Sequence, residues 1–165
     1  MIPAIAVIFL LVTMSGVYGE KNPIRITSDR LDAYDDRSLV LFSGNVEAVQ
    51  GDTVIHADNL YIYYNREAGG GNVISGVAEG TGNIDKIELQ GNVIVKLNER
   101  TVTGGTAIFY NTEQKIVMTG NAVMMEGENV IKGDRITVFL LENRGVVDGS
   151  GGERVTATIY PGDSE

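Results

Sequence analysis

The chain has 165 residues, of which 13 are Lys or Arg and 22 are Asp or Glu, so its net charge is −9. An acidic chain whose basic residues never cluster cannot neutralise phosphates, and we expect no nucleic-acid partner. The sequence has no Cys and a single His, His56, which excludes disulfides and argues against a zinc site. We therefore predict one domain with an apolar core, no metal and no cofactor.

Residues 1–19 resemble a secretory signal peptide. Residues 2–14 are almost wholly apolar, and the small residues Val17 and Gly19 precede a charged segment that starts at Glu20. The apolar run is shorter than the about 20 residues that a membrane-spanning helix needs. We expect cleavage before Glu20, which leaves residues 20–165 as one domain. Because no Lys or Arg precedes the apolar run, a retained membrane anchor is the alternative.

A repeat of about 29 residues dominates the rest of the chain. One marker is a Gly-Asn dipeptide in the strings FSGNVEA, LQGNVIV and MTGNAVM, with a weaker fourth copy in VDGSGGE. The step from Gly91 to Gly120 equals the step from Gly120 to Gly149, whereas the step from Gly44 to Gly91 is longer. A second marker has its longer step after the second of its four positions, which are Asp29, Asp58, Gly105 and Asp134. Both markers place one insertion in the second repeat, at the Gly-rich residues 66–83, which we expect to form a loop or a small hairpin.

Aligning the repeats places apolar residues in shared columns at a spacing of two, which is the period of a β-strand. Polar turns, such as DDRS after Tyr34 and NTEQ after Tyr110, divide each repeat into two strands. Each strand is expected to bend once, at Gly-Asn in one strand and at the Asp marker in the next. Short turns make successive strands antiparallel, so the prediction is an all-β protein with two facing sheets around an apolar inner wall.

Two segments carry a family resemblance: ITSDRLDAYDDRSLVLFSGNVEAVQGDTVIHADNLYIYYN and its shorter echo TVTGGTAIFYNTEQKIVMTGNAVMMEGENVIKGDRITV. Over residues 24–147 the chain resembles the OstA-like family of lipopolysaccharide-transport proteins. The resemblance implies an open, twisted β-jelly roll whose apolar interior accepts the acyl chains of lipid A. It also implies a non-enzymatic periplasmic protein of outer membrane biogenesis, which forms a bridge by head-to-tail edge stacking on copies of itself and on LptC-like and LptD-like proteins. An LptC-like subunit anchored in the inner membrane is the alternative within the family.

Acyl chains offer no hydrogen bonds and need an extended apolar surface shielded from water. Burying one methylene group contributes about 0.8 kcal/mol, so several chains can be held without polar contacts. The inner columns are therefore the predicted lipid-binding groove, although each of these residues taken singly fits an ordinary core. The candidates are Val40, Phe42, Val46, Ala48, Leu60, Ile62, Ile87, Leu89, Val93, Val95, Phe109, Ile116, Met118, Met124, Ile136 and Val138.

The other conspicuous side chains indicate structure rather than catalysis. We expect His56 to face solvent and the marker aspartates to form hydrogen bonds at the bends, because Gly105 replaces the Asp in the third repeat. A column of aromatic residues on the opposite parity is predicted to form a cross-strand ladder on the outside: Tyr34, Tyr63, Tyr110 and Phe139.

Two further classes of protein stay open. A β-solenoid enzyme acting on glycans would need two carboxylates about 5 to 10 Å apart in one cleft, whereas a structural self-assembling protein would bind no lipid. The segment VTATIY alternates well enough for one more strand, and the sequence leaves open whether residues 153–165 close the sheet.

Overall fold

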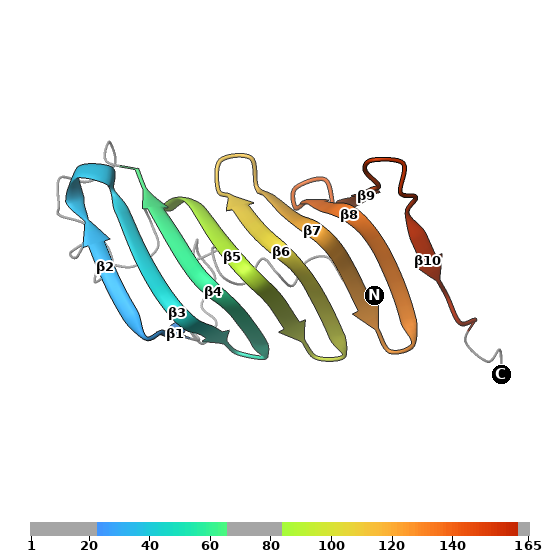
Figure 1. Ribbon diagram of the computed structural model, residues 1–165, viewed down its shortest axis with the longest axis horizontal. Helices are drawn as coiled ribbons and strands as arrows, with labels where there is room; N and C mark the ends of the chain where they lie inside the picture. Colours follow the sequence, from blue (N-terminus) through green and yellow to red (C-terminus); the bar gives the residue numbers. More distant parts are fainter. Residues whose placement is uncertain (1–22, 66–83, 162–165) are drawn as a thin grey trace.

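The computed structural model describes residues 23–65 and 84–161 (Figure 1). The predicted signal segment at 1–19 and the predicted insertion at 66–83 lie outside these residues. Within them the chain forms ten strands and one short 3-10 helix, η2: β1 (Arg25–Thr27), β2 (Arg30–Tyr34), η2 (Asp35–Arg37), β3 (Leu39–Gln50), β4 (Thr53–Tyr64), β5 (Ile84–Leu97), β6 (Arg100–Tyr110), β7 (Lys115–Glu126), β8 (Asn129–Phe139), β9 (Arg144–Asp148) and β10 (Thr156–Thr158). In the described ranges no helix is long and apolar enough to cross a membrane.

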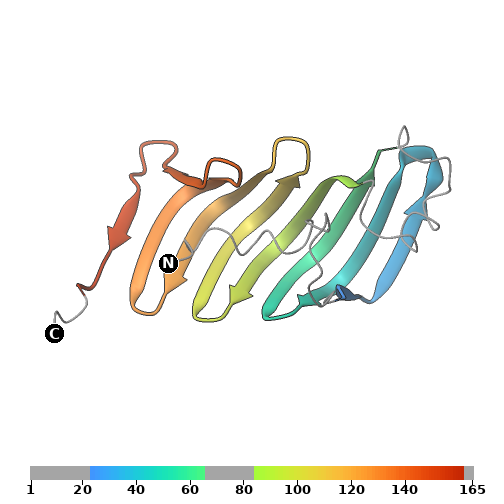
Figure 2. The same ribbon diagram turned by 180° about the vertical axis from the view of Figure 1, so that it is seen from behind.

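All strand pairs are antiparallel, and the strands form one open sheet with the order β1-β3-β4-β5-β6-β7-β8-β10. Each long strand, from β3 to β8, pairs with the next long strand in the sequence. The all-β fold predicted from the repeats and the open β-jelly roll implied by the family resemblance are both confirmed. Figure 2 shows the same row of inclined strands from behind.

Every ladder between two long strands is interrupted near its middle. The shifts in register fall between Ser43 and Val46 on β3, between His56 and Asn59 on β4, and at matching places in β5, β6 and β7. Such bulges bend a strand, and they align across the sheet, so the two facing sheets of the prediction are halves of one continuous sheet. We call β2, β9 and the strand segments paired between them the first half-sheet, and β1, β10 and the segments between them the second half-sheet.

The Gly-Asn dipeptides form these bends because both residues adopt a positive φ: +79° and +48° for Gly44 and Asn45, and +78° and +48° for Gly91 and Asn92. Gly tolerates this region at no steric cost, and Asn is among the few other residues that visit it. At Gly91 a Cβ atom would also collide with the carboxylate of Asp58. Glycine is therefore required at the bend for two independent reasons.

The marker aspartates lie opposite these dipeptides. The Asn45 side-chain amide donates to the Asp29 carboxylate at 2.7 Å, and the Asn92 amide donates to Asp58 at 2.9 Å. The predicted hydrogen bonds at the bends are thus confirmed for two of the aspartates, with the Asn of the next bend as partner. In the third repeat Gly105 lies against Gly120, and an added Cβ of Gly120 would be 3.1 Å from the Gly105 Cα, so this bend is made by close backbone contact.

The terminal strands are split at both ends of the sheet. β1 and β2 both pair with β3, and β9 and β10 both pair with β8, so each terminal pair corresponds to one bent strand. At the C-terminal end residues 149–155 form a loop in place of the bend. The sequence left open whether residues 153–165 add a strand to the sheet. In the structure Thr156 to Thr158 form β10 and pair with β8.

Candidate functional site

The inner faces of the two half-sheets form one apolar cluster. In the first half-sheet the register aligns Val40, Ile62, Ile87, Phe109, Ile116 and Val138 in one row across six strands. A matching row in the second half-sheet consists of Ala48, Ile55, Val95, Val102, Met124 and Ile131. Alternation along each strand explains both rows, since every second residue points to the same side of a pleated sheet.

Thirteen of the sixteen candidate residues from the sequence are buried in this cluster. The most deeply buried are Val40 at 0% exposure, Val93 at 1% and Val46 at 2%. Ile87, Phe109 and Met124 are only partly buried and pack against the others. Among the candidates, the more accessible positions therefore all lie in the two rows just described.

The same cluster contains residues that the candidate set lacks, namely Ile55, Ala57, Ile84, Val102, Ala107 and Ala122. Ile55 and Val102 occupy one column of the repeat alignment, so the periodicity was sufficient to find them. At the N-terminal edge Leu31 pairs with Phe42 on the inner face and is nevertheless 52% exposed. An apolar inner surface therefore continues to the open edge of the first half-sheet.

Beyond the apolar rows each inner face ends in polar residues, and we call these two stretches the rims. The rim of the second half-sheet contains Gln50, Thr53, Arg100 and Glu126, and the Arg100 Nη2 donates to the Glu126 carboxylate at 2.5 Å.

The rim of the first half-sheet contains Ser38, Tyr64, Asn111 and Gln114. There the Asn111 amide donates to the Ile84 carbonyl at 2.8 Å, and the Gln114 amide donates to the Asn111 carbonyl at 2.6 Å. Tyr64 packs against the apolar cluster. Its partial burial raises the pKa of the phenol above the ordinary value of 10.0, because the ionised form loses solvation. The Tyr64 side chain therefore lies where this rim meets the apolar cluster, and its phenol is partly removed from water.

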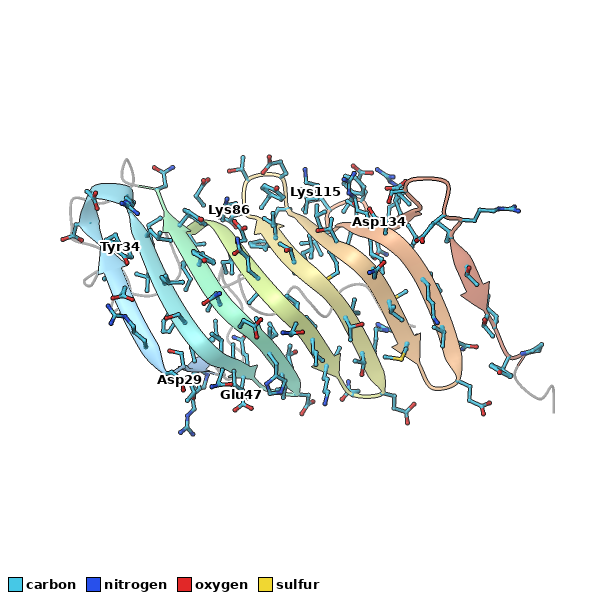
Figure 3. The ribbon with its side chains drawn as sticks, in the orientation of Figure 1. Asp29, Tyr34, Glu47, Lys86, Lys115 and Asp134 are labelled. Carbon is cyan, nitrogen blue, oxygen red and sulfur yellow. The ribbon has the colours of Figure 1, made fainter. Side chains whose placement is uncertain are left out.

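The outer face of the first half-sheet has a different character. The four predicted aromatic residues lie in one outward-facing row, as expected, but they alternate across the strands with Leu39, Lys86 and Lys115 and do not pair with one another. Each ring carries a cation instead: Lys86 Nζ lies 4.2 Å from the Tyr63 ring centroid and Lys115 Nζ lies 4.7 Å from that of Tyr110. Arg37 lies over Tyr34 at 5.3 Å and Arg144 over Phe139 at 4.1 Å. Figure 3 shows Tyr34, Lys86 and Lys115 near the same ends of the strands.

His56 points to the outer face, where its Nδ1 lies 3.8 Å from the Glu47 carboxylate, and its side chain is 40% exposed. The expectation that it faces solvent is confirmed. Within residues 23–65 and 84–161 no group of three or more His, Asp or Glu side chains could hold a metal ion.

The sequence was compared with protein families and with known proteins, and the matches include lipopolysaccharide transport proteins. The family described as "LptA/(LptD N-terminal domain) LPS transport protein" matches residues 25–144. An uncharacterized protein of Rhizobium meliloti is 38% identical over 141 residues, which is 85% of this chain and 72% of that protein. The lipopolysaccharide export system protein LptA of Escherichia coli K12 is 29% identical over 142 residues, with the same two coverages of 85% and 72%.

A solved structure has the same fold. The crystal structure of LptH, the LptA-homologous periplasmic component of the lipopolysaccharide transport device of Pseudomonas aeruginosa, superposes with a TM-score of 0.64 at 16% identity and covers 85% of this chain and 96% of that one. The resemblance to the OstA-like family stated from the repeats is confirmed. The chain belongs to the LptA/LptD N-terminal domain family of lipopolysaccharide transport proteins.

Proposed function

We propose that this protein binds lipopolysaccharide through its acyl chains and passes it across the periplasm as one segment of a bridge between the two membranes. The observation that supports this function best is the apolar inner face, which continues across the strands from the Leu31 edge to Val147 on β9. Family membership supports the same role. The protein acts as a carrier and needs no chemical step.

The lipid-binding residues are the sixteen inner candidates, with Ile87, Phe109 and Met124 as the first to meet a ligand because they are only partly buried. Most of the inner residues are buried in the apolar cluster, so acyl chains enter by replacing apolar contacts of that cluster. Exchange of one apolar contact for another costs little free energy, and the thioethers of Met118 and Met124 adapt to a changed shape.

The two ends of the sheet supply the contacts of the bridge. In the described part of the chain the outer edges of β1, β2, β9 and β10 pair with no further strand, and unpaired edges invite strand addition. Leu31 is 52% exposed at one end, and Ile159 at 68% and Tyr160 at 55% are exposed at the other. The protein stacks head to tail through these edges on copies of itself and on LptC-like and LptD-like proteins.

Residues 1–19 direct the chain to the periplasm and are then removed, and residues 20–165 remain as a single domain. Mass spectrometry of the exported protein tests this step. A mature N-terminus at Glu20 supports it, whereas a protein that keeps residues 1–19 and fractionates with the inner membrane favours an anchored, LptC-like subunit.

Binding is tested with the mature protein and two ligands, intact lipopolysaccharide and the same lipopolysaccharide stripped of its acyl chains. We expect saturable binding of the intact lipid and at least a tenfold weaker interaction with the deacylated form, because each lost methylene removes about 0.8 kcal/mol of possible burial. Equal binding of both forms, or filaments that bind neither, would overturn the carrier function and favour a structural protein.

A further inference from the structure

Arg100 is a cation in an unusual place. It is the first residue of β6, it pairs with Leu97 on β5 and with Glu126 on β7, and it precedes the buried Val102 by two positions. It therefore lies on the inner side of the second half-sheet. Its side chain is only 13% exposed, while that of its partner Glu126 is 55% exposed.

The other Lys and Arg residues on the described strands lie on the outer side. Lys86 and Lys115 lie in the aromatic row, and Lys96 and Arg135 are paired with the outward-facing Val54 and Thr119. Arg100 is thus the one strand cation, among the residues that the structure describes, that shares a face with the apolar cluster. It borders the row that contains Val95, Val102 and Met124.

Desolvation of a charge is costly unless the charge is paired. Glu126 pairs with the guanidinium in this structure, but its own exposure means that its carboxylate can turn into water at small cost. Guanidinium groups bind phosphate through two parallel hydrogen bonds. An amphiphile whose acyl chains occupy the apolar cluster has its headgroup at the rims, where Arg100 lies.

We propose that Arg100 binds a phosphate on the headgroup of the lipid carried by this protein, and that Glu126 occupies the guanidinium until the phosphate replaces it. The inference rests on the proposed function and adds to it a headgroup contact on the second rim. The exchange forms and breaks only hydrogen bonds. Arg100 thereby selects phosphorylated lipids, whereas the apolar cluster accepts acyl chains whatever their headgroup.

The experiment measures the affinity of the full mature protein for lipid A and for lipid A treated with phosphatase, each dispersed in the same detergent. Arg100→Gln is expected to weaken binding of the phosphorylated lipid about tenfold or more, since hydrogen bonds to charged groups contribute about 1.5–3 kcal/mol, and to leave binding of the dephosphorylated lipid unchanged. Arg135→Gln removes the same charge from the outer face and is expected to change neither affinity.

Glu126→Gln gives a second measurement that does not require loss of Arg100. It removes the competing carboxylate charge and is expected to strengthen binding of the phosphorylated lipid alone. If Arg100→Gln and Glu126→Gln leave the preference for phosphorylated lipid unchanged, or alter both affinities equally, the pair is only a cross-strand contact and the inference is overturned. If the unmodified protein binds neither lipid, the proposed function itself fails, which is a distinct result.

Discussion

The two faces of the first half-sheet are built by the same strands and yet have opposite chemistry. On β4 the inner residue Leu60 is 5% exposed within the apolar cluster, whereas its neighbour Tyr61 faces outward and stacks on Tyr63 with ring centroids 6.5 Å apart. On β6 Phe109 packs inward while Tyr110 carries Lys115 on its ring. The difference shows that the outer side chains form specific pairs, such as stacked rings and cation–π contacts. The inner side chains make only non-directional apolar contacts, which together form a continuous surface.

This contrast explains why only the inner face suits an acyl chain. A ligand on the outer face would have to displace cation–π pairs and ion pairs such as Lys86–Glu88. A ligand on the inner face displaces only apolar contacts, which it replaces in kind. The contrast can be sharpened or broken by changes on either face.

The largest effect is expected from truncation on the inner face. Leu60→Ala removes a buried side chain and is expected to lower the free energy of unfolding by about 2–5 kcal/mol. Tyr61→Ala, one residue further along the same strand, is expected to cost about 1 kcal/mol through loss of the stacked pair. Urea unfolding of both variants measures the difference, and equal losses would contradict the assignment of faces.

Gly91→Ala alters a bend between the two half-sheets and is expected to have the next largest effect. Alanine at a φ of +78° is strained, and its Cβ collides with the Asp58 carboxylate. We expect a loss of about 1–3 kcal/mol in the free energy of unfolding. Adding Asp58→Gly should restore part of that loss, because it removes the collision. Asp58→Gly alone is the control, because it also removes the hydrogen bond from Asn92. If Gly91→Ala destabilises the Asp58→Gly protein as much as it destabilises the unmodified protein, the collision contributes nothing and the strain at Gly91 causes the loss.

A smaller effect is expected on the outer face. Lys86→Met removes the cation over the Tyr63 ring and is expected to cost about 0.5–1 kcal/mol, with little change in lipid binding. Thermal unfolding and the lipid-binding assay test the two parts separately. A strong loss of lipid binding in a stable Lys86→Met protein would break the distinction between the faces.

The smallest expected effect is a pH dependence at the rim. Because burial raises the pKa of Tyr64 in the folded protein, the unfolded chain loses this proton first as the pH rises above about 10. The contribution of the neutral phenol to stability is therefore complete below that pH and is lost as the pH rises through the folded pKa. Tyr64→Phe should unfold with a shallower alkaline dependence than the unmodified protein, and parallel pH curves would contradict this.

Much of the fold could be predicted because aligning the repeats shows apolar residues at a spacing of two, which is the period of a pleated strand. The columns that contain Val40, Val93 and Met118 assigned the inner face correctly, and the turns after Tyr34 and Tyr110 ended the strands where the structure ends them. The terminal strands were harder to predict, since the loop at 149–155 replaces a Gly-Asn bend and leaves β9 and β10 only five and three residues long.

The side-chain partners at the bends and rims were less visible in the sequence. Asn45 and Asn92 appeared as part of a bend, and only the structure shows that they bind the aspartates of the preceding bent strand. The sequence did hint at this pairing of Asp with Asn. The one repeat that has Gly105 in place of the Asp is also the one in which the two backbones are in close contact at the bend. The inward position of Arg100 follows from its spacing of two from Val102, but a charged residue at a strand end gives no reason by itself to look there.

The central claim, that lipid occupies the inner and not the outer face, is tested most directly by photocrosslinking on β6. A photoreactive phenylalanine analogue replaces Phe109 in one exported protein and its outward neighbour Tyr110 in another, and each is probed for attached lipopolysaccharide after irradiation. An adduct at position 109 and none at 110 is the predicted result. Labelling at 110 alone, or at neither position in folded and exported protein, would contradict the account.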